Sequence, residues 1–315
     1  MRLLNALSGF GLGLLTAGAA FAQEAPLSGH PVDKAMGFQP AATELAREIH
    51  DLDYMILVII TAICVFVTLL LVYVLMRFNQ RANPKPASFT HNSPLEIAWT
   101  LVPIIILVVI GSFSLPVLFK QAEIPEADLT IKVTGNQWYW SYEYLVSDDP
   151  AQNPAFDAFL VDASYAIDDM AAGWDKANQE MGPAQVMSDI AVKKLEYFGY
   201  TKDDFLLATD RAVMIPVNKN VVIQLTGSDV IHAWMVPALG VQMSAVPGRL
   251  AEFWFNADKE GTYFGQCTTL CGKDHAYMPI VVKVVSEAAY AEWLAKQQAV
   301  ASNETVAPVQ VAAAD

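Results

Sequence analysis

Two long uncharged segments constrain this chain more than any other feature. Neither residues 54–76 nor residues 97–119 include a charged side chain, and each segment exceeds the roughly 20 residues that an α-helix needs to cross a bilayer. The 315-residue chain is 54% hydrophobic and only 17% charged, which is too apolar for an ordinary soluble protein. The pattern predicts a two-helix transmembrane hairpin over residues 53–119, with a connecting loop at 77–96.

The first 22 residues have the layout of a secretory signal peptide. Arg2 supplies a positive start, an apolar run follows, and Ala20-Phe21-Ala22 fits an A-x-A cleavage site. We expect cleavage after residue 22, which would leave residues 23–52 as an N-terminal segment outside the membrane. The alternative is an uncleaved anchor helix.

The charges of the hairpin loop predict its orientation. Arg77, Arg81 and Lys85 lie in the loop, and the single acid, Glu96, lies at its far end. Positively charged loops stay in the cytoplasm. We therefore expect loop 77–96 inside the cell, and both the N-terminal segment and everything after residue 119 outside.

The part of the chain after the hairpin is strongly acidic. From residue 120 onward, 26 Asp and Glu stand against 13 Lys and Arg. This excess indicates either a soluble acidic surface or a field that attracts a basic partner. It argues against binding of nucleic acid.

Short β-prone runs separated by turn signals fill most of this acidic part. They lie at 129–145, 212–216, 220–226, 231–236, 250–256, 261–266 and 279–285. Such spacing predicts an antiparallel β-sandwich. Residues 148–205 interrupt it as an acidic, partly helical insertion, either a tolerated surface excursion or a docking surface. A last helix is expected over 286–298, with a disordered tail at 299–315.

Four potential metal ligands lie within twelve positions near the C-terminus: Cys267, Cys271, His275 and Met278. His232, on an earlier predicted strand, is a candidate distant ligand. Zinc would take two cysteines and two histidines but has no use for a methionine, whereas copper binds all three residue types. Two thiolates can also bridge two copper ions, an arrangement suited to electron transfer. Copper is favoured, and zinc or a disulfide remains the alternative.

The same residues form part of a larger set of motifs. G-Q-C-x-x-L-C-G-x-x-H-x-x-M-P at 265–279, D-V-I-H-A-W at 229–234, A-V-P-G-R at 245–249 and N-Q-W-Y-W-S-Y-E-Y at 136–144 together resemble subunit 2 of the haem-copper cytochrome c oxidases. The hairpin, with N-S-P-L-E-I-A-W-T at 92–100, matches too, and its loop looks like the alphaproteobacterial branch of that family. The resemblance implies an all-β Greek-key cupredoxin sandwich in the periplasm over residues 120–298, holding the dinuclear copper centre called CuA.

The resemblance also assigns roles to individual residues. It implies that Cys267 and Cys271 bridge the two coppers, that His232 and His275 bind one copper each, and that Met278 and the main-chain carbonyl of Thr269 are further ligands. It implies that Trp138 receives electrons from cytochrome c and that Gln137, Glu143 and Asp229 lie on the docking face. Glu96 would mark the entrance of a proton path, although an acid at a helix N-terminus also satisfies the helix dipole.

These roles imply a subunit through which electrons enter a proton-pumping oxidase of the bacterial inner membrane. The implied partners are cytochrome c and oxidase subunits 1 and 3, and oxygen is reduced to water in subunit 1. No catalytic residue is assigned to this chain. A copper-delivery protein would need neither the hairpin nor Trp138, and quinol-oxidising relatives lack the two cysteines.

Three positions depart from the family pattern. This chain has Thr269 where the family usually has Glu, Ser244 where it usually has Asp, and Asn136 where it usually has His. The family's Glu side chain also reaches a magnesium ion at the boundary with the catalytic subunit. A threonine hydroxyl is a poor ligand for this hard cation, so we expect the magnesium site to be absent or altered.

Overall fold

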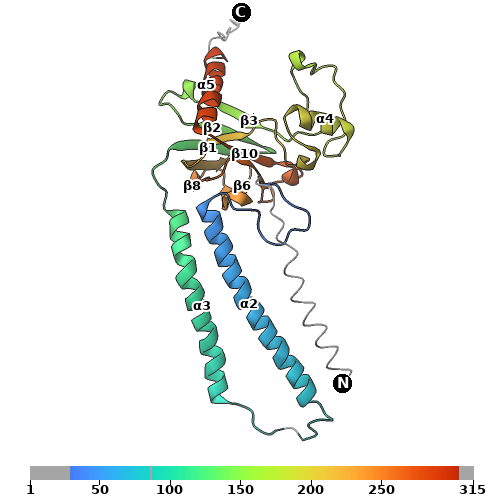
Figure 1. Cartoon of the computed structure of the whole chain (residues 1–315), viewed down its shortest axis with the longest axis vertical. Helices are drawn as coiled ribbons and strands as arrows, with labels where there is room; N and C mark the ends of the chain where they lie inside the picture. Colours follow the sequence, from blue (N-terminus) through green and yellow to red (C-terminus); the bar gives the residue numbers. More distant parts are fainter. Residues whose placement is uncertain (1–28, 86, 305–315) are drawn as a thin grey trace, which may run out of the picture.

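The computed structural model describes residues 29–85 and 87–304, and the expected signal peptide at 1–22 lies outside them. Two long helices precede a β-sandwich, with a short helix beside it and a final helix at its far end (Figure 1). The helices are α2 (Glu44–Arg77), α3 (Ser93–Ala122), α4 (Asp189–Tyr197) and α5 (Glu287–Glu304). The strands are β1 (Leu129–Asn136), β2 (Tyr139–Tyr144), β3 (Ala155–Ala158), β4 (Val213–Pro216), β5 (Asn220–Gly227), β6 (His232–Val236), β7 (Val241–Ala245), β8 (Ala251–Asn256), β9 (Gly261–Cys267) and β10 (Pro279–Val285).

The sandwich consists of two five-stranded sheets, with strand orders β3-β2-β1-β5-β8 and β4-β10-β9-β6-β7. The predicted all-β sandwich is therefore confirmed. Its predicted antiparallel pairing is wrong in two places, because β1 pairs with β5 and β4 pairs with β10 in parallel. A parallel pair requires a long crossover between its strands. The connection from β1 to β5 provides one, since it runs through β2 and the whole insertion.

Side chains from both sheets form one core between them. Along β1 and β2 every second residue is buried, as expected for strands with one face on a core. Trp140 and Tyr142 of β2 point into this core, and Trp234 of β6 faces them from the other sheet. The Trp234 indole N–H donates a hydrogen bond to the Tyr142 hydroxyl at 3.3 Å. The alternation of β2 leaves the neighbours of Trp140 nearer the surface.

Two strands and the end of the last helix differ from the sequence-based expectation. Strand β3 lies inside the predicted insertion 148–205 and pairs with β2, so the first sheet extends into the insertion. Strand β7 was not predicted and pairs with β6. Helix α5 continues to Glu304, so the predicted disordered tail 299–315 is helical at its start. The remainder of that predicted tail lies outside the described residues.

The first hairpin helix begins earlier than predicted, at Glu44 instead of residue 53. Its N-cap residue Thr43 accepts a hydrogen bond from the Ala46 N–H and donates one to the Leu239 carbonyl, both at 2.9 Å. Ala46 is fully buried against the sandwich. Lys120 lies at the end of α3 and forms ion pairs with two acids of α2, Glu44 at 2.8 Å and Glu48 at 2.7 Å. The contacts of Thr43 and Ala46 fix the start of the hairpin to the sandwich, and the Lys120 ion pairs join the two helices of the hairpin to each other.

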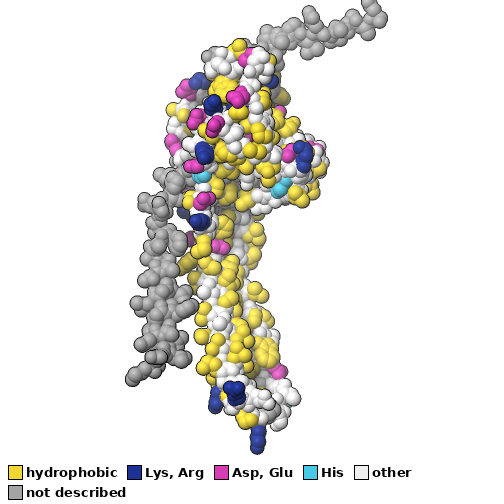
Figure 2. Space-filling view, turned by 90° about the vertical axis from the view of Figure 1, so that its right-hand side faces the viewer, with side chains coloured by type: hydrophobic (Ala, Val, Ile, Leu, Met, Phe, Trp, Pro, Cys, Tyr) yellow, Lys and Arg dark blue, Asp and Glu magenta, His cyan; other side chains and the backbone are white. Residues whose placement is uncertain are grey.

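Beyond this junction the hairpin is apolar and uncovered. In the described part of the chain, α2 and α3 are the helices long and apolar enough to cross a membrane, and none of their most apolar stretches is buried by the rest of the molecule. Figure 2 shows hydrophobic side chains along the hairpin, with Lys and Arg at its loop end and charged side chains of both signs over the sandwich. This distribution is the one a membrane-spanning hairpin requires.

Replacing Gly240 by alanine should loosen the hairpin junction. Gly240 has a φ of +69°, and a Cβ there would lie 2.7 Å from the Ala46 Cα. We expect a loss of about 2–4 kcal/mol of unfolding free energy from strain and overpacking. Gly248 is a matched control, because its φ is +77° but a Cβ would meet nothing within 4 Å. Thermal unfolding in detergent should show a clearly larger loss for Gly240→Ala than for Gly248→Ala; equal losses would contradict the close packing.

Candidate metal centre

Two neighbouring strands and one loop carry the predicted ligands. Strand β9 ends at Cys267, and β10 begins directly after Met278, so the loop 268–278 joins two adjacent strands. Strand β6 lies on the other side of β9 and begins with His232. The pairing of β6 with β9 therefore brings His232 beside the loop, although 35 residues separate it from Cys267.

The potential ligand atoms are close together. The two cysteines are free and almost fully buried, with their Sγ atoms 3.8 Å apart. The Cys271 Sγ lies 3.6 Å from His275 Nδ1, and the Cys267 thiol lies 3.3 Å from the carbonyl oxygen of Thr269. One ligand atom from each of His232, Cys267 and Cys271 falls within 4.8 Å of the others. Such a cluster of thiols and imidazole matches a soft or borderline metal ion.

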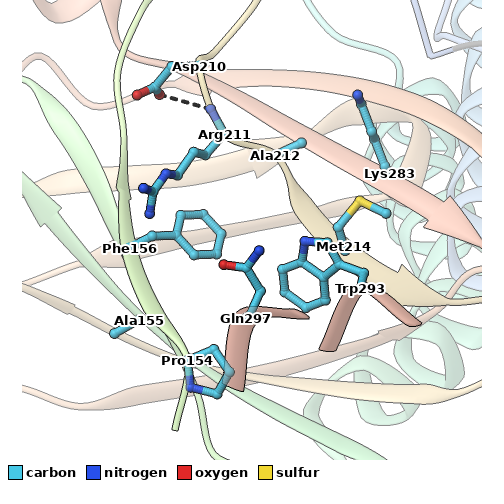
Figure 3. A pocket seen from close by; sticks show the side chains of 10 residues that line it. All are labelled: Pro154, Ala155, Phe156, Asp210, Arg211, Ala212, Met214, Lys283, Trp293 and Gln297. Carbon is cyan, nitrogen blue, oxygen red and sulfur yellow. Dashed lines mark hydrogen bonds between the residues drawn. The ribbon is translucent and has the colours of Figure 1, made fainter. Parts of the chain in front are cut away.

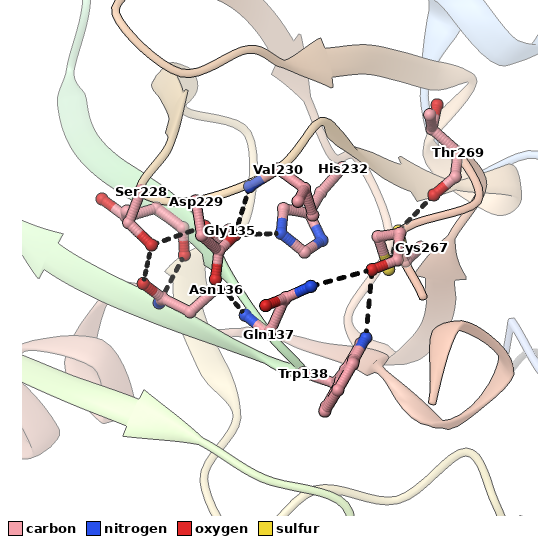
Figure 4. A network of polar contacts seen from close by, with 12 residues as sticks. Gly135, Asn136, Gln137, Trp138, Ser228, Asp229, Val230, His232, Cys267 and Thr269 are labelled. Atoms are coloured by element: carbon pink, nitrogen blue, oxygen red, sulfur yellow. Dashed lines mark hydrogen bonds and ion pairs between the residues drawn. The ribbon is translucent and has the colours of Figure 1, made fainter. Parts of the chain in front are cut away.

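The orientation of His232 is the most informative feature of the cluster. Its ring is fully buried, and Nε2 lies 2.9 Å from the Asp229 carboxylate (Figure 4). A carboxylate accepts this hydrogen bond, so Nε2 carries the proton and Nδ1 keeps its lone pair. Among the described residues, that buried Nδ1 has no hydrogen-bond partner. A carboxylate behind one nitrogen and an unpaired second nitrogen is the usual arrangement of a metal-binding histidine.

Met278 supplies the residue type that distinguishes copper from zinc. It is fully buried and belongs to the same core cluster as both cysteines. Two cysteines and two histidines alone would fit zinc equally well. A buried methionine favours copper, and the Met278 carbonyl accepts a hydrogen bond from the Cys267 N–H at 3.1 Å. The donor set therefore fits copper better than zinc.

The two thiols hold their protons unequally. Burial raises the pKa of Cys267, but the neighbouring His232 ring and backbone N–H groups outweigh burial, so that pKa is lowered overall. Burial, followed by the charge on Cys267, raises the pKa of Cys271. A metal ion that binds both sulfur atoms would displace the protons that the thiols still carry.

Trp138 lies at the edge of the cluster, in the turn between β1 and β2. In the aromatic run Trp138-Tyr139-Trp140, Trp140 is fully buried and Trp138 is only partly buried. The Trp138 indole N–H donates a hydrogen bond to the Cys271 carbonyl at 3.2 Å. Gly272, with a φ of +129°, permits this contact, because a Cβ there would lie 3.0 Å from the indole.

The other predicted surface residues have different surroundings. Gln137 is exposed, donates its backbone N–H to Asp229 at 2.8 Å, and lies 3.3 Å from the Cys271 carbonyl through its side-chain amide (Figure 4). Asp229 therefore orients both His232 and the turn that carries Trp138. Its side chain is also one-third exposed. Glu143 lies farther along β2, where it forms an ion pair with Lys132 of β1 at 3.2 Å.

Glu96 lies in the first turn of α3, far from this cluster. Asn92 caps that helix, and the Asn92 backbone N–H donates to the Glu96 carboxylate at 3.3 Å. This geometry accounts for an acid at that position as a helix-capping group.

Sequence reasoning missed several contacts that shape the site. Asn136 accepts a hydrogen bond from Ser228 at 2.6 Å and donates one to Ser141 at 2.9 Å, and it thereby fixes the start of the turn that carries Trp138. Lys273 lies over the Trp138 ring, and Gln185 of the insertion reaches the ligand loop. Sequence spacing could not reveal the contacts of Asn136 with Ser228, of Lys273 with Trp138 or of Gln185 with Asp274, because their members come from distant segments.

A pocket lies elsewhere on the sandwich, between β3, β4 and α5 (Figure 3). Phe156, Arg211, Lys283 and Trp293 are among its lining residues. None of the predicted ligands lines it. The amino group of Lys283 lies over the Tyr200 ring and the Arg211 guanidinium over Phe156, so the two cations do not converge on a common point.

Comparisons with known proteins agree with this arrangement. The family model for the transmembrane domain of cytochrome c oxidase subunit II matches residues 31–117, and the model for its periplasmic domain matches residues 190–285. The cytochrome c oxidase subunit 2 of Cereibacter sphaeroides is 57% identical over 284 residues, covering 90% of this chain and 87% of that protein. A probable cytochrome c oxidase subunit 2 of Rickettsia bellii is 40% identical, covering 87% of this chain and 88% of that protein.

A solved structure is similar as well. The crystal structure of the periplasmic domain of cytochrome oxidase subunit II of Bradyrhizobium japonicum is 38% identical, covers 56% of this chain and 98% of that chain, and has a TM-score of 0.40. The identity and coverage of the two subunit 2 relatives determine the family. This chain belongs to the cytochrome c oxidase subunit II family and is a membrane-anchored subunit of a haem-copper oxidase.

Proposed function

We propose that this chain accepts electrons from a cytochrome c at a dinuclear CuA centre and passes them to haem in subunit 1, where oxygen is reduced to water. The observation that carries this proposal is the unpaired, buried Nδ1 of His232 beside two free thiols. A buried polar atom without a partner destabilises a fold unless something fills its coordination. A copper ion would satisfy it.

The proposed ligands are those that the family resemblance implies, and the distances in the cluster support them. Cys267 and Cys271 would bridge the two metal ions, and His232 and His275 would each bind one, with Met278 and the Thr269 carbonyl as weaker ligands. The sulfur separation of 3.8 Å and the 3.6 Å contact from Cys271 to His275 support this assignment. Two coppers held by two thiolates would accept and release one electron at a time, shared between both ions, with little change in geometry on reduction.

The protein's own groups provide the route toward the metal ligands. Trp138 would receive the electron at the surface, and its indole N–H is bonded to the Cys271 carbonyl. This hydrogen bond connects a partly exposed aromatic ring to a ligand residue without an intervening water molecule. Asp229 supports the same route from the other side, because it fixes both His232 and the backbone of Gln137.

The proposed membrane orientation follows from the hairpin. The positively charged loop 77–96 would lie in the cytoplasm and the sandwich in the periplasm of a bacterial inner membrane. The uncovered apolar faces of α2 and α3 would contact lipid and the partner subunits 1 and 3. Glu96 would then lie at the cytoplasmic side, where it could serve a proton path in addition to capping α3.

The first test is to load the full chain with copper in detergent, count copper per chain, and record its electron paramagnetic resonance spectrum. We expect two coppers sharing one delocalised electron. One copper with a localised spectrum, or thiols that form a disulfide instead of binding copper, would contradict the proposal. The full chain is required because residues before the hairpin pack on the sandwich. Ala42 is buried, and Gly29 forms a β-bridge with Tyr263 of β9.

We also expect no stoichiometric magnesium bound through this subunit in the purified oxidase. Thr269 and Ser244 offer hydroxyls where the family pattern has carboxylates, and hydroxyls hold a hard dication poorly. Metal analysis of the complex tests this expectation. Thr269→Glu, combined with Ser244→Asp, should restore magnesium; one magnesium per unmodified complex, lost on mutation of these positions, would contradict it.

A further inference from the structure

A lysine lies over the ring that is proposed to receive electrons. The Lys273 Nζ is 4.8 Å from the centroid of the Trp138 ring, and the Lys273 side chain is 73% exposed. A cation over an aromatic face is attracted by the ring's electrons. From residue 120 onward, acidic side chains outnumber basic ones by 26 to 13. The Lys273 contact therefore places a positive charge beside Trp138 in an otherwise acidic part of the chain.

Asp274 holds this lysine in place. Its Oδ2 forms an ion pair with the Lys273 Nζ at 2.6 Å, and its side chain is 24% exposed. The other oxygen, Oδ1, accepts a hydrogen bond from the side-chain amide of Gln185 at 3.3 Å. Gln185 belongs to the insertion 148–205, so the insertion contacts the ligand loop through this pair.

The insertion is itself built to hold Gln185. The Gln185 backbone N–H donates to the carboxylate of Asp162, which is buried, at 2.6 Å. The fully buried Lys194 of α4 donates to the carbonyls of Ala163 and Tyr165 at 2.9 and 2.7 Å. These bonds fix the segment around Asp162 and give Gln185 a defined position beside the ligand loop.

We propose that Lys273 is a specificity-determining residue for the electron donor, and that the insertion holds it over Trp138 through Gln185 and Asp274. The proposal rests on the proposed function. A donor whose docking face is basic throughout brings a positive charge against Lys273 at Trp138, and the two repel each other. A donor with a neutral or acidic group opposite Trp138, surrounded by basic residues, avoids this repulsion. The insertion thereby narrows the choice of cytochrome c.

The charge can be tested in the purified oxidase complex with a strongly basic mitochondrial cytochrome c as donor. At low ionic strength, Lys273→Met should lower KM by about two- to fivefold, the range of one exposed charge interaction, with a smaller change in kcat. The difference should vanish at high salt. Lys273→Arg should retain the original KM. Lys296→Met is the matched control, because Lys296 is 70% exposed and paired with Glu292 on α5.

The role of the insertion requires a double-mutant cycle. Gln185→Ala should lower KM in the same direction as Lys273→Met but by less, and it should have no further effect in the Lys273→Met background. Gln152→Ala is its control, since Gln152 also lies in the insertion and donates to an aspartate, Asp149, at 3.2 Å. An unchanged or raised KM in Lys273→Met would overturn the proposal, as would a full Gln185→Ala effect in the double variant.

Copper content and the electron paramagnetic resonance spectrum of each variant distinguish a failure of the proposed function from a failure of the role of Lys273. We expect both to match the unmodified complex, because neither substitution removes a ligand. If the unmodified complex lacks the dinuclear signature, the proposed function fails, and this inference fails with it. If the signature is present and KM does not respond to Lys273, only the inference fails.

Discussion

Replacing Cys271 by serine should eliminate the dinuclear copper signature and reduce cytochrome c oxidation to less than about 1% of its original rate, since even supporting groups behind metal ligands contribute 10- to 100-fold. Serine has nearly the same size as cysteine, so the buried site should keep its shape while losing a bridging thiolate. Copper analysis and the electron paramagnetic resonance spectrum of the purified oxidase measure the first effect, and steady-state turnover measures the second.

Cys64 provides the matched control for this experiment. It is a free cysteine in the middle of α2, exposed on the hairpin and outside the ligand cluster. Cys64→Ser should keep two coppers and normal turnover. Two coppers with a delocalised spectrum in Cys271→Ser would contradict the proposed bridging role.

Replacing Trp138 by alanine should lower the rate of electron transfer from cytochrome c by about 100-fold or more, as expected when a reacting group loses its positioned partner. The substitution removes both the aromatic ring at the surface and the hydrogen bond to the Cys271 carbonyl. Copper content should remain at two per chain, because Trp138 is not a proposed ligand. Rapid mixing of reduced cytochrome c with the oxidised oxidase measures the rate directly.

Two further substitutions separate the ring from its hydrogen bond. Trp138→Phe keeps an aromatic ring but loses the N–H donor, so its rate should fall between those of the original chain and the alanine variant. Trp174→Ala is the control, since Trp174 is a partly buried tryptophan of the insertion that packs on Tyr197. A normal rate in Trp138→Ala would exclude this residue as the point of electron acceptance.

The sequence alone predicted those features that depend on neighbouring residues. The two uncharged segments became α2 and α3, because a helix satisfies its own backbone hydrogen bonds within the segment. The aromatic residues 138–140 could not all be buried, because side chains of a strand point to opposite faces, and Trp140 is the fully buried one. Cys267, Cys271 and His275 lie close together because the end of one strand and the loop that follows it carry them.

Only the tertiary structure decided the features that join distant segments. The sequence had no signal for the pairing of β3 with β2, the parallel pairs of the two sheets, or the earlier start of α2 against the sandwich. Each of these depends on which surface a segment meets, and its own residues do not specify that surface.

The metal centre shows the same division at the level of single side chains. The sequence showed the types and spacing of the potential ligands in the loop. The orientation of His232 by Asp229, the contact of Trp138 with the Cys271 carbonyl, and the link from Gln185 through Asp274 to Lys273 were not. Hydrogen bonds and ion pairs act over a few ångströms in space, and the packing of the two sheets and the insertion determines which distant residues come within that range.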